Sequence, residues 1–375
     1  MKKVFYIDPQ SGDNLAMYDY ELLSRIEGID IHYICSKTYK YNKLENTVIV
    51  PLFNYTRKTN SLFKGISYIF SLISLLKYII REKPQVIHIQ WFRLPKFEYY
   101  YYKILKKIYK FSFVHTVHNI LPHVKTRNAS VQYAKLYSLC DMLITHTESS
   151  SKDLVSRFRI EDSKITVAPH GPLKYSISSD EISNRIREIK DTHKIKAKNI
   201  VALLGYQSFY KGTDLAINAW LHSKKLLNNP DWILIVAGKS KDYSPPELNS
   251  NQNIIIINDK LSDLDFISIL KMSSLVLLPY RRIDQSGVLL TIIEEQIPYC
   301  ATEVGELCKP FEVGDIGWRI PYPSEESVRI TLEYIMKNSG ELDEKKERDI
   351  IWNTVKELYS WDRSSKITKE IYDTI

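Results

Sequence analysis

A complete strand–helix–strand unit lies in residues 199–238, which read NIVALLGYQSFYKGTDLAINAWLHSKKLLNNPDWILIVAG. Its two ends, 199–206 and 231–238, are short continuous apolar runs, as expected of strands buried on both faces. Residues 213–227 between them predict a helix, which the turn YKG at 210–212 precedes. Two buried strands joined by a helix run parallel, so the stretch predicts a parallel sheet covered by helices.

The same alternation fills the rest of the chain. Before residue 199, strands are predicted at 3–8, 31–36, 47–52, 86–91, 111–119, 142–147 and 165–170, and helices at 15–26, 62–82, 97–109, 129–140 and 149–158. After residue 238, strands are predicted at 253–258, 275–280 and 298–303, and helices at 263–273 and 287–296. A charged stretch at about 172–198 has no clear pattern and separates the two series. We therefore expect two doubly wound, Rossmann-like α/β domains, at 1–185 and 186–342, with C-terminal helices at 343–375 packing back on the first.

The charge of the chain is uneven. Its net charge is +8, yet residues 57–135 alone hold fifteen Lys and Arg against two Glu, a net charge of +13. Tyrosines 99–102 lie among these cations, and aromatic rings beside cations suit an anionic membrane surface. An ordinary solvated face is the alternative. Nucleic acid is not expected, because no motif of a nucleic-acid-binding domain is present.

Two further patterns bear on location. The four cysteines form no CxxC pair, so neither a disulfide framework nor a metal framework is expected, and the cytoplasm is the expected compartment. The start, MKKVFYID, is too short in apolar residues for a signal peptide. The longest apolar run, 66–80, contains Lys77 and is shorter than a membrane span, so we expect a buried helix, with an interfacial one as the alternative.

Three histidines occur within HTVHNILPH, residues 115–123. His115 and His118 point to opposite faces of a strand and cannot hold one metal ion, and Pro122 prevents a helix from bringing them together. His115 shares its face with apolar residues and is expected in the core. His118 lies where the strand ends, and ligands of open α/β sheets bind beyond the carboxyl ends of the strands. We therefore expect His118 to face a cleft between the domains.

At this point the order of motifs becomes informative. VIHIQWFRLP (86–95), TVHNILPH (116–123), GYQSFYKGTDLAINAW (205–220), LVLLPYRRIDQSGVLL (275–290) and IPYCATEVGEL (297–307) follow one another along the chain. The set resembles retaining glycosyltransferases of family 4, which have the two-domain GT-B fold, and in particular the subgroup of bacterial capsule, exopolysaccharide and lipopolysaccharide biosynthesis. The resemblance extends over nearly the whole chain.

The resemblance and the local pattern together assign a donor site to the second domain. Lys211 would neutralise the diphosphate, with the amides of Ser286, Gly287 and Val288 at a helix start. Family members often carry an arginine a few residues before this lysine; here Arg281 or Arg282 would replace it. Gly205, Tyr206 and Gly238 would border the sugar and nucleotide. Asp284, Gln285 and Thr291 are further expected sugar- and nucleotide-binding residues, at positions near those where the family usually has glutamates.

The remaining expectations concern catalysis and partners. His118 and Lys211 are the expected catalytic residues, and the expected acceptor-side residues are Gly12, Asp13, Asn119 and His123. The donor would be a UDP- or GDP-linked sugar, and the acceptor a lipid-linked saccharide or an oligosaccharide. No cofactor or metal is expected, since Asp263 and Asp265 form a DxD that is typical of an acidic helix start. The alternative is a catalytically degenerate GT-B subunit that binds and scaffolds a partner transferase.

Overall fold

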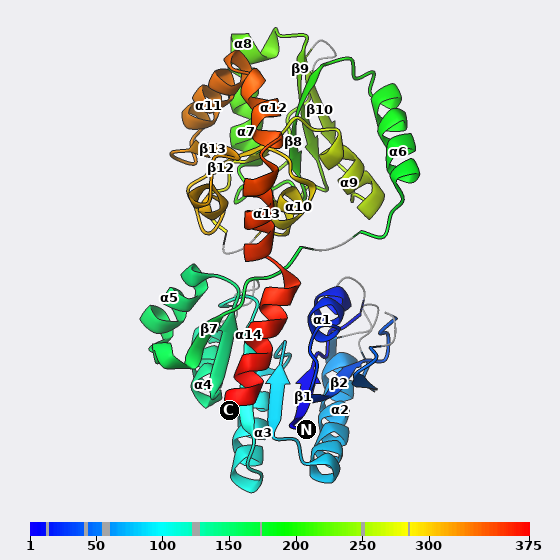
Figure 1. Ribbon diagram of the computed structural model, residues 1–375, viewed down its shortest axis with the longest axis vertical. Helices are drawn as coiled ribbons and strands as arrows, with labels where there is room; N and C mark the ends of the chain where they lie inside the picture. The colour runs from blue at the N-terminus through cyan, green and yellow to red at the C-terminus, as the bar shows by residue number, and fades with distance from the viewer. Residues whose placement is uncertain are drawn as a thin grey trace. The chain divides into compact units, whose positions relative to one another are not determined.

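The structure is a computed structural model that describes residues 1–12, 15–40, 44–54, 61–121, 128–172, 175–248, 252–283 and 286–375. The chain divides into two compact units (Figure 1). Unit 1 comprises Met1–Gly171 and Tyr359–Ile375, and unit 2 comprises Pro172–Leu358. Each unit has one parallel sheet with helices on both faces, which confirms the predicted fold class.

Unit 1 is built on a seven-stranded sheet in the order β3-β2-β1-β4-β5-β6-β7. All its strand pairs are parallel; the strands are β1 (Lys3–Ile7), β2 (Asp30–Ser36), β3 (Thr47–Phe53), β4 (Val86–Ile89), β5 (Ser112–Val117), β6 (Met142–Thr145) and β7 (Ile165–Val167). Its helices are α1 (Leu15–Leu23), α2 (Ser61–Glu82), α3 (Pro95–Ile108), α4 (Ala129–Leu139), α5 (Glu148–Phe158), the 3-10 turn η1 (Asp162–Lys164) and α14 (Trp361–Thr374). Because the strands are parallel, their carboxyl ends lie at one edge of the sheet, and the loops after β1, β4 and β5 meet there.

Helix α2 has two apolar faces. Leu72, Leu75 and Ile79 are buried in the core that lies on one face of the unit 1 sheet. The opposite face of α2 leaves Phe63 and Phe70 about two-thirds exposed, at 68% and 65%. By length and composition alone, Phe63–Glu82 could cross a membrane, although 22% of its apolar window is buried in the unit. The expected buried helix is thus buried on one side only.

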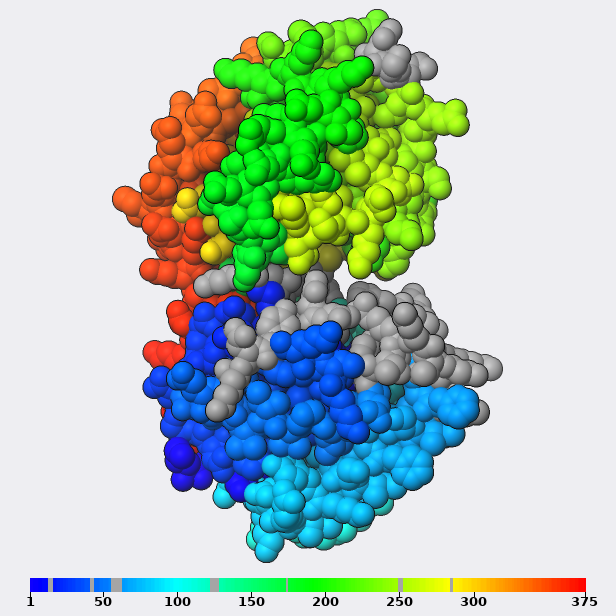
Figure 2. Space-filling view, turned by 90° about the vertical axis from the view of Figure 1, so that its right-hand side faces the viewer, coloured from blue at the N-terminus to red at the C-terminus, as the bar shows by residue number. Residues whose placement is uncertain are grey.

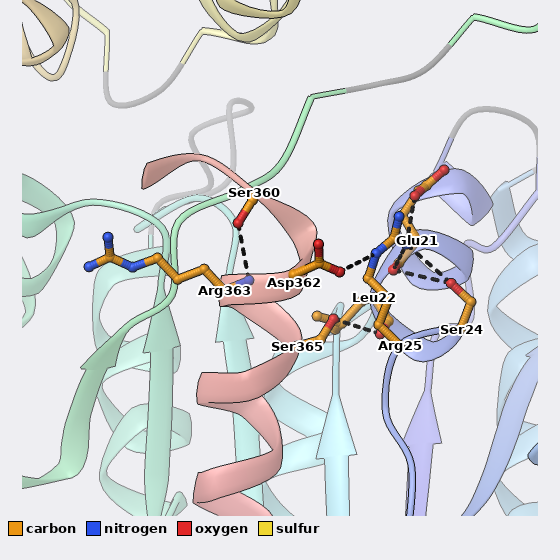
Figure 3. A network of polar contacts seen from close by, with 8 residues as sticks. All are labelled: Glu21, Leu22, Ser24, Arg25, Ser360, Asp362, Arg363 and Ser365. Carbon is orange, nitrogen blue, oxygen red and sulfur yellow. Dashed lines mark hydrogen bonds and ion pairs between the residues drawn. The ribbon is translucent and has the colours of Figure 1, made fainter. Parts of the chain in front are cut away.

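The C-terminal helix α14 completes unit 1 on the other face of its sheet. Trp361, Ile371 and Tyr372 join the core that α1 forms with β1 and β2. Figure 3 shows how α14 is fastened to α1: Arg25 Nε donates to Asp362 Oδ1 at 3.0 Å, and Ser365 Oγ donates to the Leu22 carbonyl at 2.9 Å.

Unit 2 is built on a six-stranded parallel sheet in the order β10-β9-β8-β11-β12-β13. Its strands are β8 (Asn199–Leu204), β9 (Trp232–Ala237), β10 (Ile254–Ile257), β11 (Leu275–Leu278), β12 (Tyr299–Thr302) and β13 (Gly317–Ile320). Its helices are α6 (Ser179–Thr192), α7 (Thr213–Leu221), α8 (Lys224–Leu227), α9 (Asp263–Lys271), α10 (Gly287–Glu295), the 3-10 turn η2 (Lys309–Glu312), α11 (Glu325–Lys337), α12 (Gly340–Lys346) and α13 (Asp349–Leu358). The strand–helix–strand unit of 199–238 lies at the centre of this sheet, as β8, α7, α8 and β9.

The structure differs from the sequence expectation at the domain boundaries. The first unit ends at Gly171 rather than at 185, because the stretch expected to lack structure contains α6, which packs against α9 of unit 2. Of the C-terminal segment 343–375, only Tyr359–Ile375 belongs to unit 1. The long helix expected at 213–227 is divided at His222–Ser223, where the Ser223 hydroxyl caps α8.

Candidate active site

The loop after β8 places Lys211 against the backbone of Gly205. Gly205 has a φ of +96°, which side-chain-bearing residues rarely adopt. A Cβ atom at Gly205 would lie 2.6 Å from Lys211 Nζ and 3.9 Å from a methyl group of Val288. The three predicted residues therefore converge on one point, and the missing side chain of Gly205 leaves room for the ammonium group.

Lys211 is a buried cation without a countercharge in the part of unit 2 that the structure describes. Its side chain is 8% exposed, and no carboxylate of a described residue lies within ion-pair distance. Its Nζ lies 5.6 Å from the centre of the Tyr280 ring. Burial lowers the pKa of the ammonium from its ordinary value, with Tyr210 acting in the opposite direction. An unpaired buried charge is costly, so this arrangement favours an anionic ligand.

The start of α10 supplies the second part of the anion site. Ser286 caps the helix, its Oγ accepting from the Leu289 amide at 3.4 Å. The amides of Gly287 and Val288 belong to the first turn, where helical amides have no partner inside the helix. Among the described residues, no atom outside the helix lies within 4 Å of a Cβ built on Gly287, so a ligand could approach this end. The predicted residues Asp284 and Gln285 lie outside the described residues.

The two arginines after β11 differ in their surroundings. Both terminal nitrogens of Arg281 donate to the Asp214 carboxylate, at 2.7 and 2.6 Å, and Nη1 also donates to the Phe209 carbonyl. Arg281 therefore braces the loop that carries Lys211, and its guanidinium is engaged within the protein rather than free for a phosphate. Arg282 is exposed.

A pocket of about 200 Å³ lies beside this loop and contains three of the residues predicted to border the donor, Gly205, Tyr206 and Gly238. The fold itself requires glycine at position 238, since a Cβ there would collide with the Gly205 carbonyl oxygen. Thr291 is buried, and its hydroxyl donates to the Gly287 carbonyl at 3.1 Å. The hydroxyl proton of Thr291 is thus used inside α10, not toward a sugar.

Sequence reasoning missed the rest of this pocket. Lys260 lines it together with Tyr175 and Phe266, whose ring centres are 6.1 Å apart. Asp263 also lines it, at the start of α9, where Ser262 and Asp265 form a capping box. These residues lie in loops and helix starts far from the motif residues in sequence, and only the order of the strands brings them to one edge.

In unit 1, His118 follows β5 and is enclosed by aromatic rings. The ring of Trp91 stacks on it at 4.5 Å with an interplanar angle of 11°, and Tyr18 meets it edge-on at 4.9 Å. Burial and the neighbouring His146 and His170 hold the pKa of His118 well below its usual range. The imidazole is therefore neutral at pH 7.

The hydrogen bonds of neutral His118 can be assigned. His146 Nδ1 faces the Ala168 carbonyl at 2.9 Å and must donate to it, so His146 Nε2 accepts. His118 Nδ1 lies 3.2 Å from that nitrogen and donates. His118 Nε2 then needs a donor, and the Gln90 side-chain amide lies 2.9 Å away. Gln90 can donate to His118 only with its amide nitrogen turned toward the ring, and its amide oxygen then faces His88 Nε2 and Thr116 Oγ1 on the other side.

Both ring nitrogens of His118 are therefore engaged by Gln90 and His146, and a substrate hydroxyl would have to displace one of them. The predicted acceptor residues Gly12 and Asn119 follow β1 and β5, whereas Asp13 and His123 lie outside the described residues. His115 is buried and its Nδ1 donates to the Ile89 carbonyl at 2.9 Å, which confirms it as a core residue. Among the described residues, no group of three or more His, Cys, Asp or Glu could hold a metal ion.

Comparison with known family models finds a match in unit 1. Residues 21–171 match a family model described as Glycosyltransferase Family 4, and this match ends at Gly171, the last residue of the first segment of unit 1. No curated protein matches the chain in sequence.

Solved structures match the chain along its whole length. A glycosyltransferase from Rickettsia africae ESF-5 is 15% identical with a TM-score of 0.67, and the match covers 99% of this chain and 98% of that one. Sucrose-phosphate synthase from Thermosynechococcus elongatus is 12% identical with a TM-score of 0.68, covering 100% and 98%. Anabaena HepE in complex with UDP-glucose is 10% identical with a TM-score of 0.68, covering 100% of both chains. The chain has a GT-B fold. The family match and this fold together support a glycosyltransferase of the GT-B type.

Proposed function

We propose that this GT-B protein transfers a sugar from a nucleotide-sugar donor to an acceptor hydroxyl. The observation that carries the proposal is Lys211, a buried ammonium without a carboxylate partner in the described part of unit 2. A nucleotide diphosphate would supply the missing negative charge, and the amides at the start of α10 would bind it further. The HepE structure, which contains UDP-glucose, is consistent with such a donor.

Leaving-group stabilisation would be the main catalytic effect. Lys211, Gly287 and Val288 would hold the departing diphosphate in a preorganised site, without a metal ion. The acceptor would attack from the face that the diphosphate leaves, so the anomeric configuration would be retained. His118 would lie near the transferred sugar, and Gln90 is the partner that a sugar hydroxyl would replace.

The acceptor side of the proposal concerns surface polysaccharide. We propose that a lipid-linked saccharide is the acceptor, in a bacterial polysaccharide pathway, and that the protein works on the inner face of the plasma membrane. The support is the cationic stretch 57–135, with a net charge of +13 from fifteen basic and two acidic residues.

The test is a thermal-shift titration with UDP, GDP and UMP on the wild type, Lys211→Met and Lys224→Met. Lys224 is an exposed lysine of unit 2 and serves as the matched control. A ligand at 100 times its Kd adds about 2.7 kcal/mol to the stability of a folded unit. We expect one diphosphate to shift the wild type and Lys224→Met, and Lys211→Met to lose that shift.

Two further measurements decide the outcome. Without ligand, Lys211→Met should be as stable as the wild type or more so, because it removes a buried unpaired charge. UMP should shift the wild type less than UDP, since it lacks the second phosphate. If no nucleotide shifts the wild type, the transferase proposal fails and a scaffold subunit becomes the better description.

A further inference from the structure

Helix α2 presents an apolar stripe away from the core. Phe63, Ile66, Phe70 and Ile73 recur every three or four residues, the spacing of one helix face, and Ile80 follows on that face beyond the exposed Lys77; the exposed fractions of the five lie between 44% and 68%. A surface helix of a soluble protein normally carries polar residues on this face. The stripe is therefore an apolar surface that the unit itself does not cover.

Helix α3 carries a second stripe of the same kind. Phe97, Tyr100, Ile104 and Ile108 are 44%, 53%, 57% and 65% exposed. The two helices are joined by Tyr101, which donates to the Leu72 carbonyl at 3.0 Å, and by Tyr68, which donates to Glu98 at 2.6 Å. Figure 2 shows the light-blue surface of α2 beside the cyan surface of α3.

A pocket of about 440 Å³ opens between α2 and α3, beside the stripe of α3. Its walls are mainly apolar, with Ile69 from α2, Leu94 before α3, and Pro95, Phe97 and Tyr100 from α3. Arg93 and Lys96 supply positive charge at the same pocket. The pocket also lies near the edge of the sheet where the strands have their carboxyl ends, because Arg93 follows by two residues Trp91, whose ring stacks on His118. The volume is in the range of pockets that hold small organic ligands.

The surroundings of the stripes are cationic. Residues 61–110 contain ten Lys and Arg and two Glu. Of the two glutamates, Glu98 is fully buried, and Glu82 is paired with Lys3 at 2.8 Å and with Arg81 at 2.9 Å. Lys103, Lys107 and Lys110 are exposed at or just beyond the end of α3, whereas Lys106 is paired with Asp141 at 2.6 Å.

A membrane-spanning helix and a dimer interface both fit this surface less well than a bilayer surface does. A membrane-spanning α2 would have to withdraw Leu72, Leu75 and Ile79 from the core of unit 1. A second copy of the chain would bring two cationic surfaces together, which like charges disfavour. An anionic bilayer complements both the apolar stripes and the cations around them.

We propose that the pocket between α2 and α3 binds a hydrocarbon chain of a membrane lipid, while the two stripes dock on the surface of an anionic bilayer. The inference rests on the proposed function only in naming that lipid as the anchor of the acceptor. The chain in the pocket would place its polar head near Arg93 and the edge of the sheet that carries His118.

The first experiment measures binding to vesicles of phosphatidylcholine with and without phosphatidylglycerol. The variant Phe70→Ser/Ile73→Ser is compared with Ile330→Ser/Ile350→Ser, which removes two exposed isoleucine side chains from unit 2 (54% and 84% exposed). We expect the wild type and the control to bind the anionic vesicles, and the α2 variant to bind at least tenfold more weakly with an unchanged Tm. Binding should also fall with salt and in Lys103→Gln/Lys107→Gln/Lys110→Gln.

The second experiment tests the pocket itself. A phospholipid with a diazirine in its acyl chain is photolysed in the same vesicles, and the modified peptides are mapped by mass spectrometry. Labelling within 93–100 that Phe97→Asp abolishes would support the pocket. Vesicle binding that is equal in the α2 variant and the wild type would overturn the docking surface, as would a vesicle-free dimer that Phe70→Ser/Ile73→Ser dissolves.

Labelling that spares 93–100 would overturn the pocket. None of these measurements needs a nucleotide, so the inference can fail or hold separately from the transferase proposal.

Discussion

At the scale of single residues, Lys211 links the stability of unit 2 to its ligand. Lys211 is 8% exposed, and burial lowers the pKa of its ammonium group. Burying an unpaired ammonium group costs free energy, and a bound anion would offset that cost. Binding a diphosphate would therefore stabilise the unit. Gly205 makes room for Lys211 because it has no side chain. Any side chain at a φ of +96° would be strained and would meet Lys211 Nζ.

The buried ionisable groups of unit 1 predict how its stability changes in acid. Burial lowers the pKa of His115 and His146 to about 4, and that of His170 to about 3. Their stabilising effect is complete above pH 6.5 and is lost as the pH falls toward these values, because the unfolded chain takes up the protons first. Each such histidine lowers the free energy of unfolding by about 1.4 kcal/mol per pH unit in that window.

Asp19 changes the free energy of unfolding in the opposite direction as the pH falls. Burial raises its pKa to about 6, so the folded state holds its proton more tightly and gains stability as the pH falls from 6 toward 3.8. Asp19→Asn should therefore lose more free energy of unfolding than the wild type as the pH falls from 6 to 4.5, by about 1.4 kcal/mol per pH unit. Urea denaturation at several pH values measures this, with Asp162→Asn, an exposed aspartate of unit 1, as control. Equal acid profiles for Asp19→Asn and the wild type would contradict the assignment.

At the scale of elements, the strands could be predicted and several connections could not. Buried parallel strands such as β8 and β9 are continuous apolar runs, which few other structures produce. Helix α6 was missed because its exposed face is highly charged, although Ser178 and Glu181 form a capping box and Ile182 and Ile189 are buried on the same face.

In the candidate site too, the sequence could predict some residues and not others. The position of Lys211 follows from a local turn between β8 and α7, so the motif was sufficient to find it. The partner of Arg281 was not predictable, because Asp214 lies 67 residues away and reaches it only through the fold. Lys260 and Tyr175 were missed for the same reason.

The Arg281–Asp214 pair carries a prediction about the loop of Lys211. If Arg281 acts by bracing this loop, Arg281→Ala and Asp214→Ala should weaken UDP binding by similar factors, of about tenfold or less. The double variant should then be no weaker than either single one, since both remove one interaction. Calorimetric titration with UDP measures this, with the exposed Arg282→Ala as control. A far larger loss in Arg281→Ala than in Asp214→Ala would instead indicate direct contact with the phosphates.

At the scale of the whole molecule, the chain leaves unit 1 at Gly171 and returns at Tyr359. The two points are held together inside unit 1, because the Trp361 ring packs directly against Gly171. A Cβ atom on Gly171 would lie only 2.5 Å from that ring. Ser364 also donates a hydrogen bond to the Pro169 carbonyl. The last helix is thus part of the core of the first unit, although unit 2 lies between them in sequence.

This arrangement predicts the effect of ending the chain at Leu358. Removal of α14 exposes the core residues against which Trp361, Ile371 and Tyr372 pack, and each of these side chains is worth about 1.5–3 kcal/mol when buried. We expect unit 1 to lose its cooperative unfolding transition while unit 2 keeps its own, together with its response to UDP. Differential scanning calorimetry with and without UDP measures both transitions. Lys369→Ala, on the exposed side of α14, is the control and should leave them unchanged. An unchanged first transition in the truncated chain would show that α14 is an appendage rather than a part of the core, because the sheet of unit 1 would then be stable with one face uncovered.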